Sequence, residues 1–312
     1  MAGIELTKAA IAGKARDLGA ELVGFAPVDR WEEFGDIPED YYPQRVWPLA
    51  KTVIAMGVPQ WLPIVNASPS ELGREQYLIT NALLDEAAYR LAAFLNRNGW
   101  AAINICRDGY GDIGALRQNM AAVFSHVWAA HYAGLGRVGW NHTLLTREYG
   151  PRLRLVSVLT ALEVDGDPLI EEELCTRCLL CRKICPSEAL TGDKNSRFAV
   201  MDKQRCLQQG GRLRQAFRNP CGFCTKVCPV GEDRKLFQST DLKYIFRSSR
   251  LKPMTPRRQY AGVGCTCASM AATPWKMTHG RREAKTNIGM YYVRFIQPFL
   301  LKNLSRPCST AK

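Results

Sequence analysis

The sequence predicts an α+β protein, and three observations lead to this fold class. In residues 1–165, short apolar segments typical of strands alternate with longer amphipathic segments typical of helices. Residues 166–240 hold eight of the twelve cysteines, and residues 241–312 carry 14 Lys and Arg against 2 Asp and Glu. We therefore expect an α/β domain over 1–165, a cysteine-rich domain over 166–240 and a basic C-terminal extension over 241–312.

The first domain is expected to begin with a helix and a strand. Residues 5–18 have apolar side chains at helical spacing, and Gly19 follows as a stop signal before a buried strand over 21–27. Residues 31–48 are rich in proline, aromatic and acidic residues, which favours an ordered loop. The apolar run over 52–58 predicts a second strand.

A capping box predicts the longest helix of the chain. Ser68 has the character of an N-cap residue, Pro69 suits the first helical position, and Glu71 suits the third. Leucine and alanine then repeat at helical spacing as far as Leu95, and residues 96–99 end the pattern.

Two strands and a second helix follow. Residues 100–106 predict a strand in which Cys106 is a packed thiol, and residues 107–114 form a polar, glycine-containing loop. Residues 119–132 predict an amphipathic helix, and residues 152–160 alternate and then run apolar as a strand does.

Three glycines lie close together after the second helix. Gly134, Gly136 and Gly139 fall within six residues, and Asn141 follows them. Glycine at this density lets the backbone approach a large planar or phosphate-bearing ligand, so these four residues are candidates for cofactor binding. The spacing is not GxGxxG after a strand, so it does not indicate a dinucleotide site.

The cysteines have the spacing of iron–sulfur ligands. The first run, over 175–186, reads C-x2-C-x2-C-x3-C-P, which is the bacterial ferredoxin pattern. The second run is stretched: Cys206 precedes C-x2-C-x3-C-P over 221–229. In two-cluster ferredoxins the last cysteine of each run ligates the other cluster. We therefore predict two 4Fe–4S clusters, the first held by Cys175, Cys178, Cys181 and Cys228 and the second by Cys185, Cys206, Cys221 and Cys224.

Structural zinc and disulfide bonds are the alternative roles for these cysteines. Zinc sites use four ligands for each ion, commonly as two CxxC pairs, and do not require the CxxCxxCxxxCP spacing. Disulfides need an oxidising compartment. The N-terminus shows no basic and apolar export signal, and no segment is apolar enough to span a bilayer, so we expect a soluble, cytoplasmic protein.

The basic charge of the chain is concentrated at its C-terminus. The net charge is +13, and residues 1–240 contribute almost none of it. A basic extension favours an acidic partner protein, nucleic acid or an anionic surface, and a solvated basic face is the plainer alternative. The extension also holds Cys265, Cys267 and Cys308, expected to be free thiols, and an amphipathic helix over 288–304.

Residues from about 10 to 240 resemble the superfamily of epoxyqueuosine reductases and reductive dehalogenases. The resemblance is carried by residues 22–27 with 50–54, by residues 133–151, and by the two cysteine runs with the isolated Cys206. It implies a nitroreductase-like α/β sandwich domain that holds a corrinoid (cobalamin) beside a two-cluster ferredoxin module.

The chain departs from both branches of that superfamily. Epoxyqueuosine reductases have an aspartate, their proposed proton donor, where this chain has Met120, and a Glu-Arg pair at the positions of His126 and Val127. The tRNA-binding C-terminal domain of those enzymes is replaced by the basic extension. Respiratory dehalogenases resemble residues 147–152 but usually carry an export signal. The resemblance thus implies a cytoplasmic relative of both with its own substrate.

Three functions are compatible with these features. The first is a corrinoid-dependent reductase, supplied by an electron donor such as ferredoxin or flavodoxin, that removes a halogen or an oxygen from a small molecule. The second is an electron carrier or reductive activator without a substrate of its own. The third is a flavin-dependent reductase on the same fold. For the first, the candidate proton donors are His126, Tyr110 and Tyr132.

Overall fold

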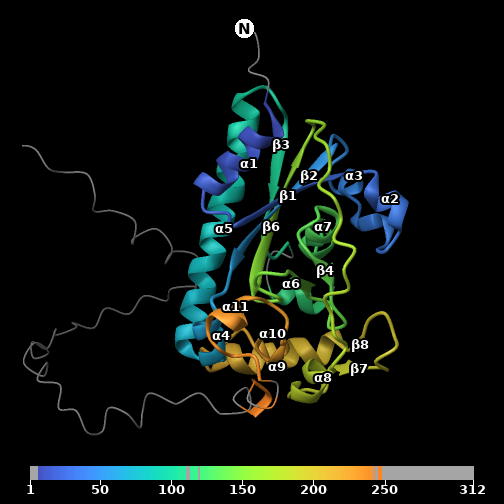
Figure 1. Cartoon of the computed structure of the whole chain (residues 1–312). Coiled ribbons are helices and arrows are strands. Elements are labelled where there is room, and N and C mark those ends of the chain that lie inside the picture. Colours follow the sequence, from blue (N-terminus) through green and yellow to red (C-terminus); the bar gives the residue numbers. More distant parts are fainter. Residues whose placement is uncertain (1–5, 110–112, 119, 242, 244, 248–312) are drawn as a thin grey trace, which may run out of the picture. The chain divides into compact units, whose positions relative to one another are not determined.

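The computed structural model describes residues 6–109, 113–118, 120–241, 243 and 245–247. Its centre is a four-stranded sheet in the order β1–β2–β6–β3, and every neighbouring pair is antiparallel. Figure 1 shows this sheet between helices. The strands are β1 (Leu22–Pro27), β2 (Thr52–Pro59), β3 (Ala102–Ile105) and β6 (Leu153–Thr160). An antiparallel sheet with helices on its faces confirms the α+β class.

The two faces of the sheet carry separate hydrophobic clusters, because successive side chains of a strand point to opposite faces. On β2, Ile54 and Met56 belong to the first cluster, which is completed by α1 (Lys8–Asp17) and α5 (Glu71–Arg97). Val53 and Ala55 belong to the second cluster, with α7 (His126–Tyr132). Seven of the eight β2 residues are buried, as expected for a central strand.

The long helix α5 begins two residues later than the capping box predicts. Ser70 is the N-cap, and its side chain accepts a hydrogen bond from the Gly73 backbone N–H at 3.0 Å. Ser68 instead belongs to the end of α4 (Leu62–Ala67), where its hydroxyl donates to the Ile64 carbonyl oxygen at 2.9 Å. The helix itself is therefore confirmed, and its starting residue was wrong.

Two other segments differ from expectation. The segment 31–48, expected to be a loop, contains three short helices: α2 (Arg30–Phe34), η1 (Glu39–Tyr41) and α3 (Pro43–Val46). The helix expected over 119–132 is shortened to α7, because Ser125 caps it by accepting a hydrogen bond from the Trp128 N–H at 3.4 Å. The same part of the chain also forms α6 (Ile113–Gln118) and the short antiparallel pair β4 (Arg137–Val138) and β5 (Leu144–Leu145).

The cysteine-rich segment follows β6 and packs as short elements joined by loops (Figure 1). Because all described residues belong to one compact unit, the boundary expected near residue 165 stays a prediction. No helix among the described residues is long and apolar enough to cross a bilayer. Most of the basic extension, with Cys265, Cys267, Cys308 and the helix expected over 288–304, lies outside the described residues. The elements are α8 (Leu180–Ile184), β7 (Leu190–Thr191), β8 (Val200–Met201), α9 (Lys203–Gln215), α10 (Phe223–Val227) and α11 (Asp233–Leu236).

A pair of leucines on α5 tests the packing of the first cluster. Leu91 is fully buried in it, whereas Leu83 on the same helix is 41% exposed. We expect Leu91→Ala to lower the free energy of unfolding by about 2–5 kcal/mol, because it leaves a cavity in the core. The matched Leu83→Ala change should cost under about 0.5 kcal/mol. Anaerobic urea unfolding measures both, and equal losses would contradict the described orientation of α5.

Candidate redox site

Four cysteines from the two runs surround one small cavity. Cys175, Cys178, Cys181 and Cys228 line it together with Trp140. Burial, together with negative charge on Cys178 and Cys175, raises the pKa of the Cys228 thiol to about 11. These are the four residues assigned to the first cluster from their spacing, and residues more than forty positions apart in the sequence therefore meet here.

The other four cysteines also gather. Burial raises the pKa of Cys221 to about 12, and charges on Cys224, Cys206 and Cys185 contribute. Burial likewise raises the pKa of Cys224 to about 11, with contributions from Cys206 and Cys185. These mutual effects show that the four thiols assigned to the second cluster lie near one another.

The donor set fits two iron–sulfur clusters. All eight thiols are free, and burial raises the pKa of five of them, which disfavours their charged form unless a metal group supplies positive charge. The two sets also adjoin each other, because the charge on Cys224 contributes to the raised pKa of Cys181. Within the described residues, no three His, Cys, Asp or Glu side chains are close enough to hold a single metal ion.

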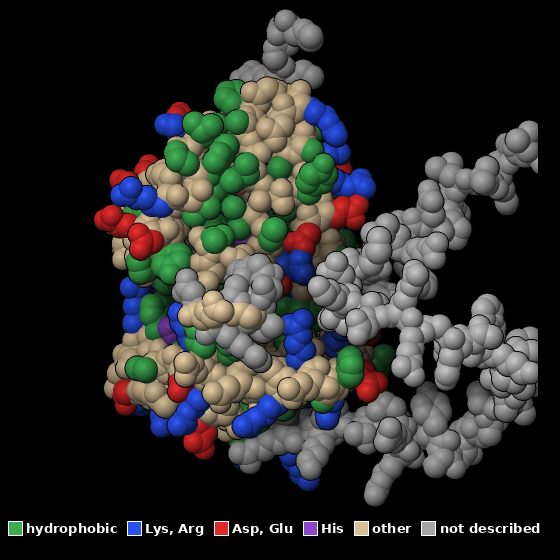
Figure 2. Space-filling view, turned by 180° about the vertical axis from the view of Figure 1, so that it is seen from behind, with side chains coloured by type: hydrophobic (Ala, Val, Ile, Leu, Met, Phe, Trp, Pro, Cys, Tyr) green, Lys and Arg blue, Asp and Glu red, His purple; other side chains and the backbone are tan. Residues whose placement is uncertain are grey.

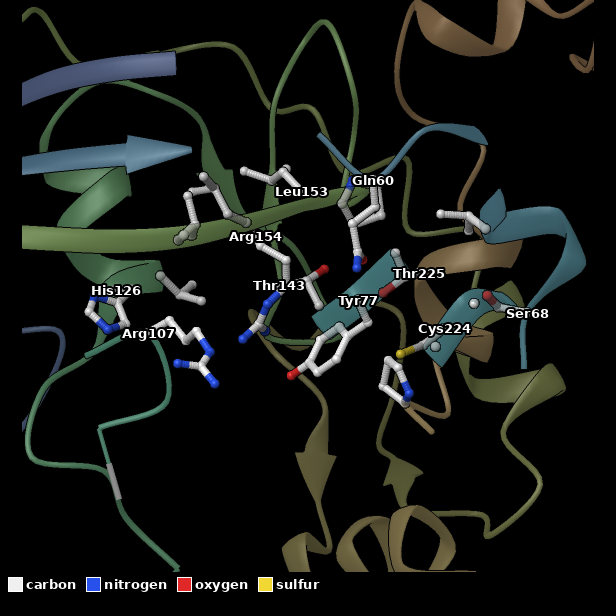
Figure 3. Close-up of a pocket in the computed structure, with 18 of the residues that line it drawn as sticks. Gln60, Ser68, Tyr77, Arg107, His126, Thr143, Leu153, Arg154, Cys224 and Thr225 are labelled. Carbon is white, nitrogen blue, oxygen red and sulfur yellow. The ribbon is translucent and has the colours of Figure 1, made fainter. Parts of the chain in front are cut away.

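A large cavity lies against the second set of thiols. Its volume is about 460 Å³, and Cys224 forms part of its wall (Figure 3). Apolar side chains from α4, β5 and β6 line it, and polar groups come from α5, β6 and the segment after β3. The lining includes Gln60, Ile64, Val65, Gln76, Tyr77, Arg107, Phe124, His126, Thr143, Leu144, Leu153, Arg154, Leu155 and Thr225.

Sequence reasoning missed the charged residues of this cavity. The Arg154 Nη2 donates to Asp108 Oδ1 at 3.0 Å, and its guanidinium lies 4.7 Å from the centre of the Tyr77 ring. Arg107 pairs with Asp85, and its buried Nε has no hydrogen-bond partner in the described part of the chain. The only sequence signal was the arginine at position 154 inside an otherwise apolar strand.

His126, a candidate proton donor, lies in the cavity wall with both ring nitrogens engaged. Its Nε2 donates to the Cys106 carbonyl oxygen at 3.0 Å, so its Nδ1 accepts from the Ser157 hydroxyl at 2.9 Å. Burial lowers its pKa to about 4. A neutral imidazole that is bonded on both sides has no proton to spare for a substrate.

The other two candidates are not brought to the cavity by the described structure. Tyr132 is fully buried among aromatic side chains, its hydroxyl donates to Asp36 Oδ2 at 3.1 Å, and burial raises its pKa. Tyr132 does not line the cavity. Tyr110 lies outside the described residues.

The glycines expected to approach a cofactor approach the chain itself. A Cβ added at Gly134 would lie 2.3 Å from the Pro168 carbonyl oxygen, and one at Gly136 would lie 2.2 Å from the Leu145 carbonyl oxygen. At Gly139 the Leu145 side chain occupies the same space. Asn141 accepts a hydrogen bond from the Thr143 hydroxyl at 2.8 Å and borders the small cavity of the first cysteine set.

The sequence of this chain is similar to those of known proteins. Residues 168–191 match the 4Fe–4S binding domain. The chain is 26% identical over 270 residues to a tetrachloroethene reductive dehalogenase of Desulfitobacterium hafniense, covering 68% of this chain and 46% of that protein. It is 25% identical over 260 residues to an epoxyqueuosine reductase of Lactococcus garvieae, covering 70% of this chain and 68% of that protein.

The fold has a counterpart among solved structures. A catabolic reductive dehalogenase superposes with a TM-score of 0.56 at 23% identity, covering 77% of this chain and 34% of that chain. The chain is thus similar, at low identity, to both reductive dehalogenases and epoxyqueuosine reductases. It spans about half the length of the dehalogenase relatives it matches. Both groups of relatives are named as reductases, and this chain matches the 4Fe–4S binding domain over residues 168–191.

The neutral state of His126 predicts how stability depends on pH. The unfolded imidazole takes up a proton near pH 6.5, whereas the folded one resists protonation until about pH 4. The free energy of unfolding should therefore fall as pH drops from 6.5 towards 4, by roughly 2 kcal/mol between pH 7 and 5.

Anaerobic urea unfolding at pH 7 and pH 5 measures this loss. In His126→Asn the difference between the two pH values should shrink by roughly that amount. His142→Asn, which removes another histidine, serves as the control. An unchanged difference in His126→Asn would show that His126 is protonated at the same pH in the folded and unfolded chains.

Proposed function

We propose that this protein is a reductase that passes electrons through two 4Fe–4S clusters to a corrinoid in the 460 Å³ cavity, for reductive cleavage of a small molecule. The observation that carries the proposal is the position of Cys224. This residue belongs to the second set of thiols and also forms the cavity wall. A group bound in the cavity would therefore be adjacent to a cluster ligand, with no intervening segment of protein.

The cavity suits a corrinoid in its chemistry. Leu153, Leu155 and Phe124 offer apolar contact to a macrocycle, while Gln60 and Gln76 offer amides to polar groups at its rim. Because both ring nitrogens of His126 are engaged, this wall offers no histidine to the cobalt ion. A bound corrinoid would supply a metal in a low oxidation state that can cleave a carbon–halogen or carbon–oxygen bond.

The chain must supply a proton and a protected site. Among the residues that line the cavity, the Tyr77 hydroxyl is the group best suited to donate the proton. The guanidinium of Arg154 lies over the Tyr77 ring and orients it within the cavity. Asp108 and Asn81 hold this guanidinium in place through two hydrogen bonds of 3.0 Å each. The apolar walls limit access of water.

Other roles proposed for this protein follow from the same features. Its electron donor would be ferredoxin or flavodoxin, and its substrate is a small molecule. The basic C-terminal extension is proposed to bind an acidic partner or nucleic acid, and the protein is proposed to act in the cytoplasm. The relatives named tetrachloroethene reductive dehalogenase and epoxyqueuosine reductase support reduction as the reaction class.

Iron analysis tests the cysteine assignment. Anaerobically prepared protein should contain roughly eight irons, and Cys206→Ala should retain roughly four because only the second cluster loses a ligand. Cys106 is exposed, not packed as the sequence predicted, and lies outside both sets, so Cys106→Ala should retain the full content. Zinc in place of iron, or full iron in Cys206→Ala, would contradict the assignment.

Absorption spectroscopy tests the corrinoid. Protein supplemented with cobalamin should keep cobalt–corrin bands after gel filtration. Gln76→Trp should lose them, because the indole fills the cavity, whereas Glu75→Trp on the exposed side of α5 should keep them. Iron–sulfur absorption should be equal in the three proteins. Iron–sulfur absorption alone in the unmodified protein would favour an electron carrier, and released flavin would favour a flavin-dependent reductase.

A further inference from the structure

We propose that electrons enter through an arginine-lined hollow beside Cys175, where a small acidic electron-transfer protein docks. This arginine hollow has a volume of about 200 Å³. It is lined by Trp128, His131, Arg137, Val138, Trp140, Glu173, Cys175, Arg177, Arg197 and Phe198. The inference rests on the proposed function, because it assumes that the thiol sets hold clusters.

The position of Cys175 links the arginine hollow to the first thiol set. Cys175 lines the hollow and also lines the small cavity that it shares with Cys178, Cys181 and Cys228. Cys224, from the second thiol set, instead faces the large cavity. The two sets thus adjoin two different openings, which gives the electrons a direction from the hollow, through the first and second clusters, to the large cavity.

The arginines of the hollow are held in place mainly by backbone oxygens. Arg177 Nη1 donates to the Ser196 carbonyl oxygen at 2.8 Å, and Arg137 Nη1 donates to the Ile170 carbonyl oxygen at 3.2 Å. Such bonds orient a guanidinium without neutralising its charge. Planar guanidinium groups that are fixed in this way are suited to bind carboxylates through paired hydrogen bonds.

The acidic residues near the hollow offset only part of this charge. Arg197 pairs with Asp36 at 2.6 Å, and Arg177 lies 3.6 Å from Glu173. Arg137 forms no ion pair in the described part of the chain. Three guanidinium groups therefore face two carboxylates, and the hollow keeps a positive balance that acidic side chains of a partner can complete.

The charge of the surrounding sequence is polarised in the same sense. Residues 174–218 carry 10 Lys and Arg against 3 Asp and Glu, whereas residues 1–173 carry 15 against 22. Arg182, Lys183 and Lys194 are exposed in the basic segment. Figure 2 shows Lys and Arg side chains, with some Asp and Glu among them, along the lower edge of the molecule, where Figure 1 places α8 and α9. A partner with acidic groups around its redox centre is steered towards this end of the molecule rather than to the acidic remainder.

A solvated basic face would explain the excess charge but not its arrangement. Arg197 lies over the Phe198 ring at 5.0 Å, and Trp128 and Phe198 pack edge to face beside the hollow. Aromatic and arginine side chains together are typical of the centre of protein interfaces. A small anion could also enter the hollow, and the experiment separates that case from docking of a protein.

The test uses the full chain with its clusters and a small acidic bacterial ferredoxin as the probe. Stopped-flow absorption follows the bleaching of the clusters by reduced ferredoxin, and calorimetry gives the Kd for oxidised ferredoxin. Arg137→Gln and Arg197→Gln together should slow cluster reduction at least tenfold at low ionic strength, weaken binding by a similar factor and reduce the salt dependence of the rate. Arg137→Lys with Arg197→Lys should restore most of the rate.

Two controls give each outcome a meaning. Arg90→Gln removes an exposed arginine of α5 that pairs with Glu86, and it should change neither rate nor binding. Reduction by photoreduced deazariboflavin, a small uncharged reagent, should be equal in all variants. If the paired glutamine variant behaves like Arg90→Gln with ferredoxin, the docking site is refuted. If it changes only the binding of inorganic phosphate, the hollow is an anion pocket and the proposal is also refuted.

The failure of this inference can be told apart from that of the proposed function. Cluster reduction is read from iron–sulfur absorption and requires neither a corrinoid nor a substrate. Absence of clusters would appear as low iron in the unmodified protein, whereas a wrong docking site would appear as unchanged ferredoxin kinetics in protein with full iron content. If only the double glutamine variant loses iron, the same measurements are made on the single Arg197→Gln variant. Its side chain is 64% exposed, so the change should leave the clusters intact.

Discussion

A fully buried arginine ties the sheet to the cysteine-rich segment. Arg152, just before β6, donates through Nε and Nη2 to the two carboxylate oxygens of Asp233 at 2.6 and 2.5 Å. It also donates to the carbonyl oxygens of Cys228 and Val230, at 3.1 and 2.6 Å. Breaking a buried pair by removing one partner typically costs 3–5 kcal/mol, because the other charge is left buried. Arg152 therefore helps to fix the position of Cys228, and with it the first thiol set.

The glycine-rich segment before β6 also joins the sheet to the cysteine-rich segment. Gly136 passes so close to the Leu145 carbonyl oxygen that no larger residue fits, and Gly150 passes equally close to the carbonyl oxygen of Val230. Trp140 packs with Leu190 and Ala199 of the cysteine-rich segment. The stretch over 133–151, which carries the resemblance to the superfamily, thus builds the junction between the two parts of the molecule. Its glycines are explained by backbone packing within the chain.

The assignment of the cysteines to two clusters stays a prediction, and it rests on their local spacing. Three thiols separated by two residues lie on one loop, and the exchanged fourth ligand follows from a known pattern. The cavity could not be predicted in the same way. Tyr77, Arg107 and Arg154 come from segments 30 and 47 residues apart, and only the pairing of β6 with the sheet brings them together.

The surroundings of each candidate side chain could not be predicted from the sequence either. His126 on an apolar helix had the character of an acid or base, but its two hydrogen-bond partners come from other segments, at Cys106 and Ser157. The predicted starting residue of α5 was wrong for a simpler reason. Ser68 and Ser70 are both good N-cap residues, and the choice between them depends on where α4 ends.

Two buried cations complete the electrostatic argument for a negative group at the thiols. Arg234 is 1% exposed, and its donors go to the carbonyl oxygens of Cys228, Lys226 and Ser239 and to the Ser239 hydroxyl. Lys226 is 3% exposed and donates to the carbonyl oxygens of Asn66 and Ser68. Burial lowers the pKa of both, and the charge on Cys228 opposes this for Arg234. Burying a cation is costly unless an opposite charge lies near it. For Arg234 the charge on Cys228 is such a partner, so a cluster held by this thiol would stabilise the buried guanidinium.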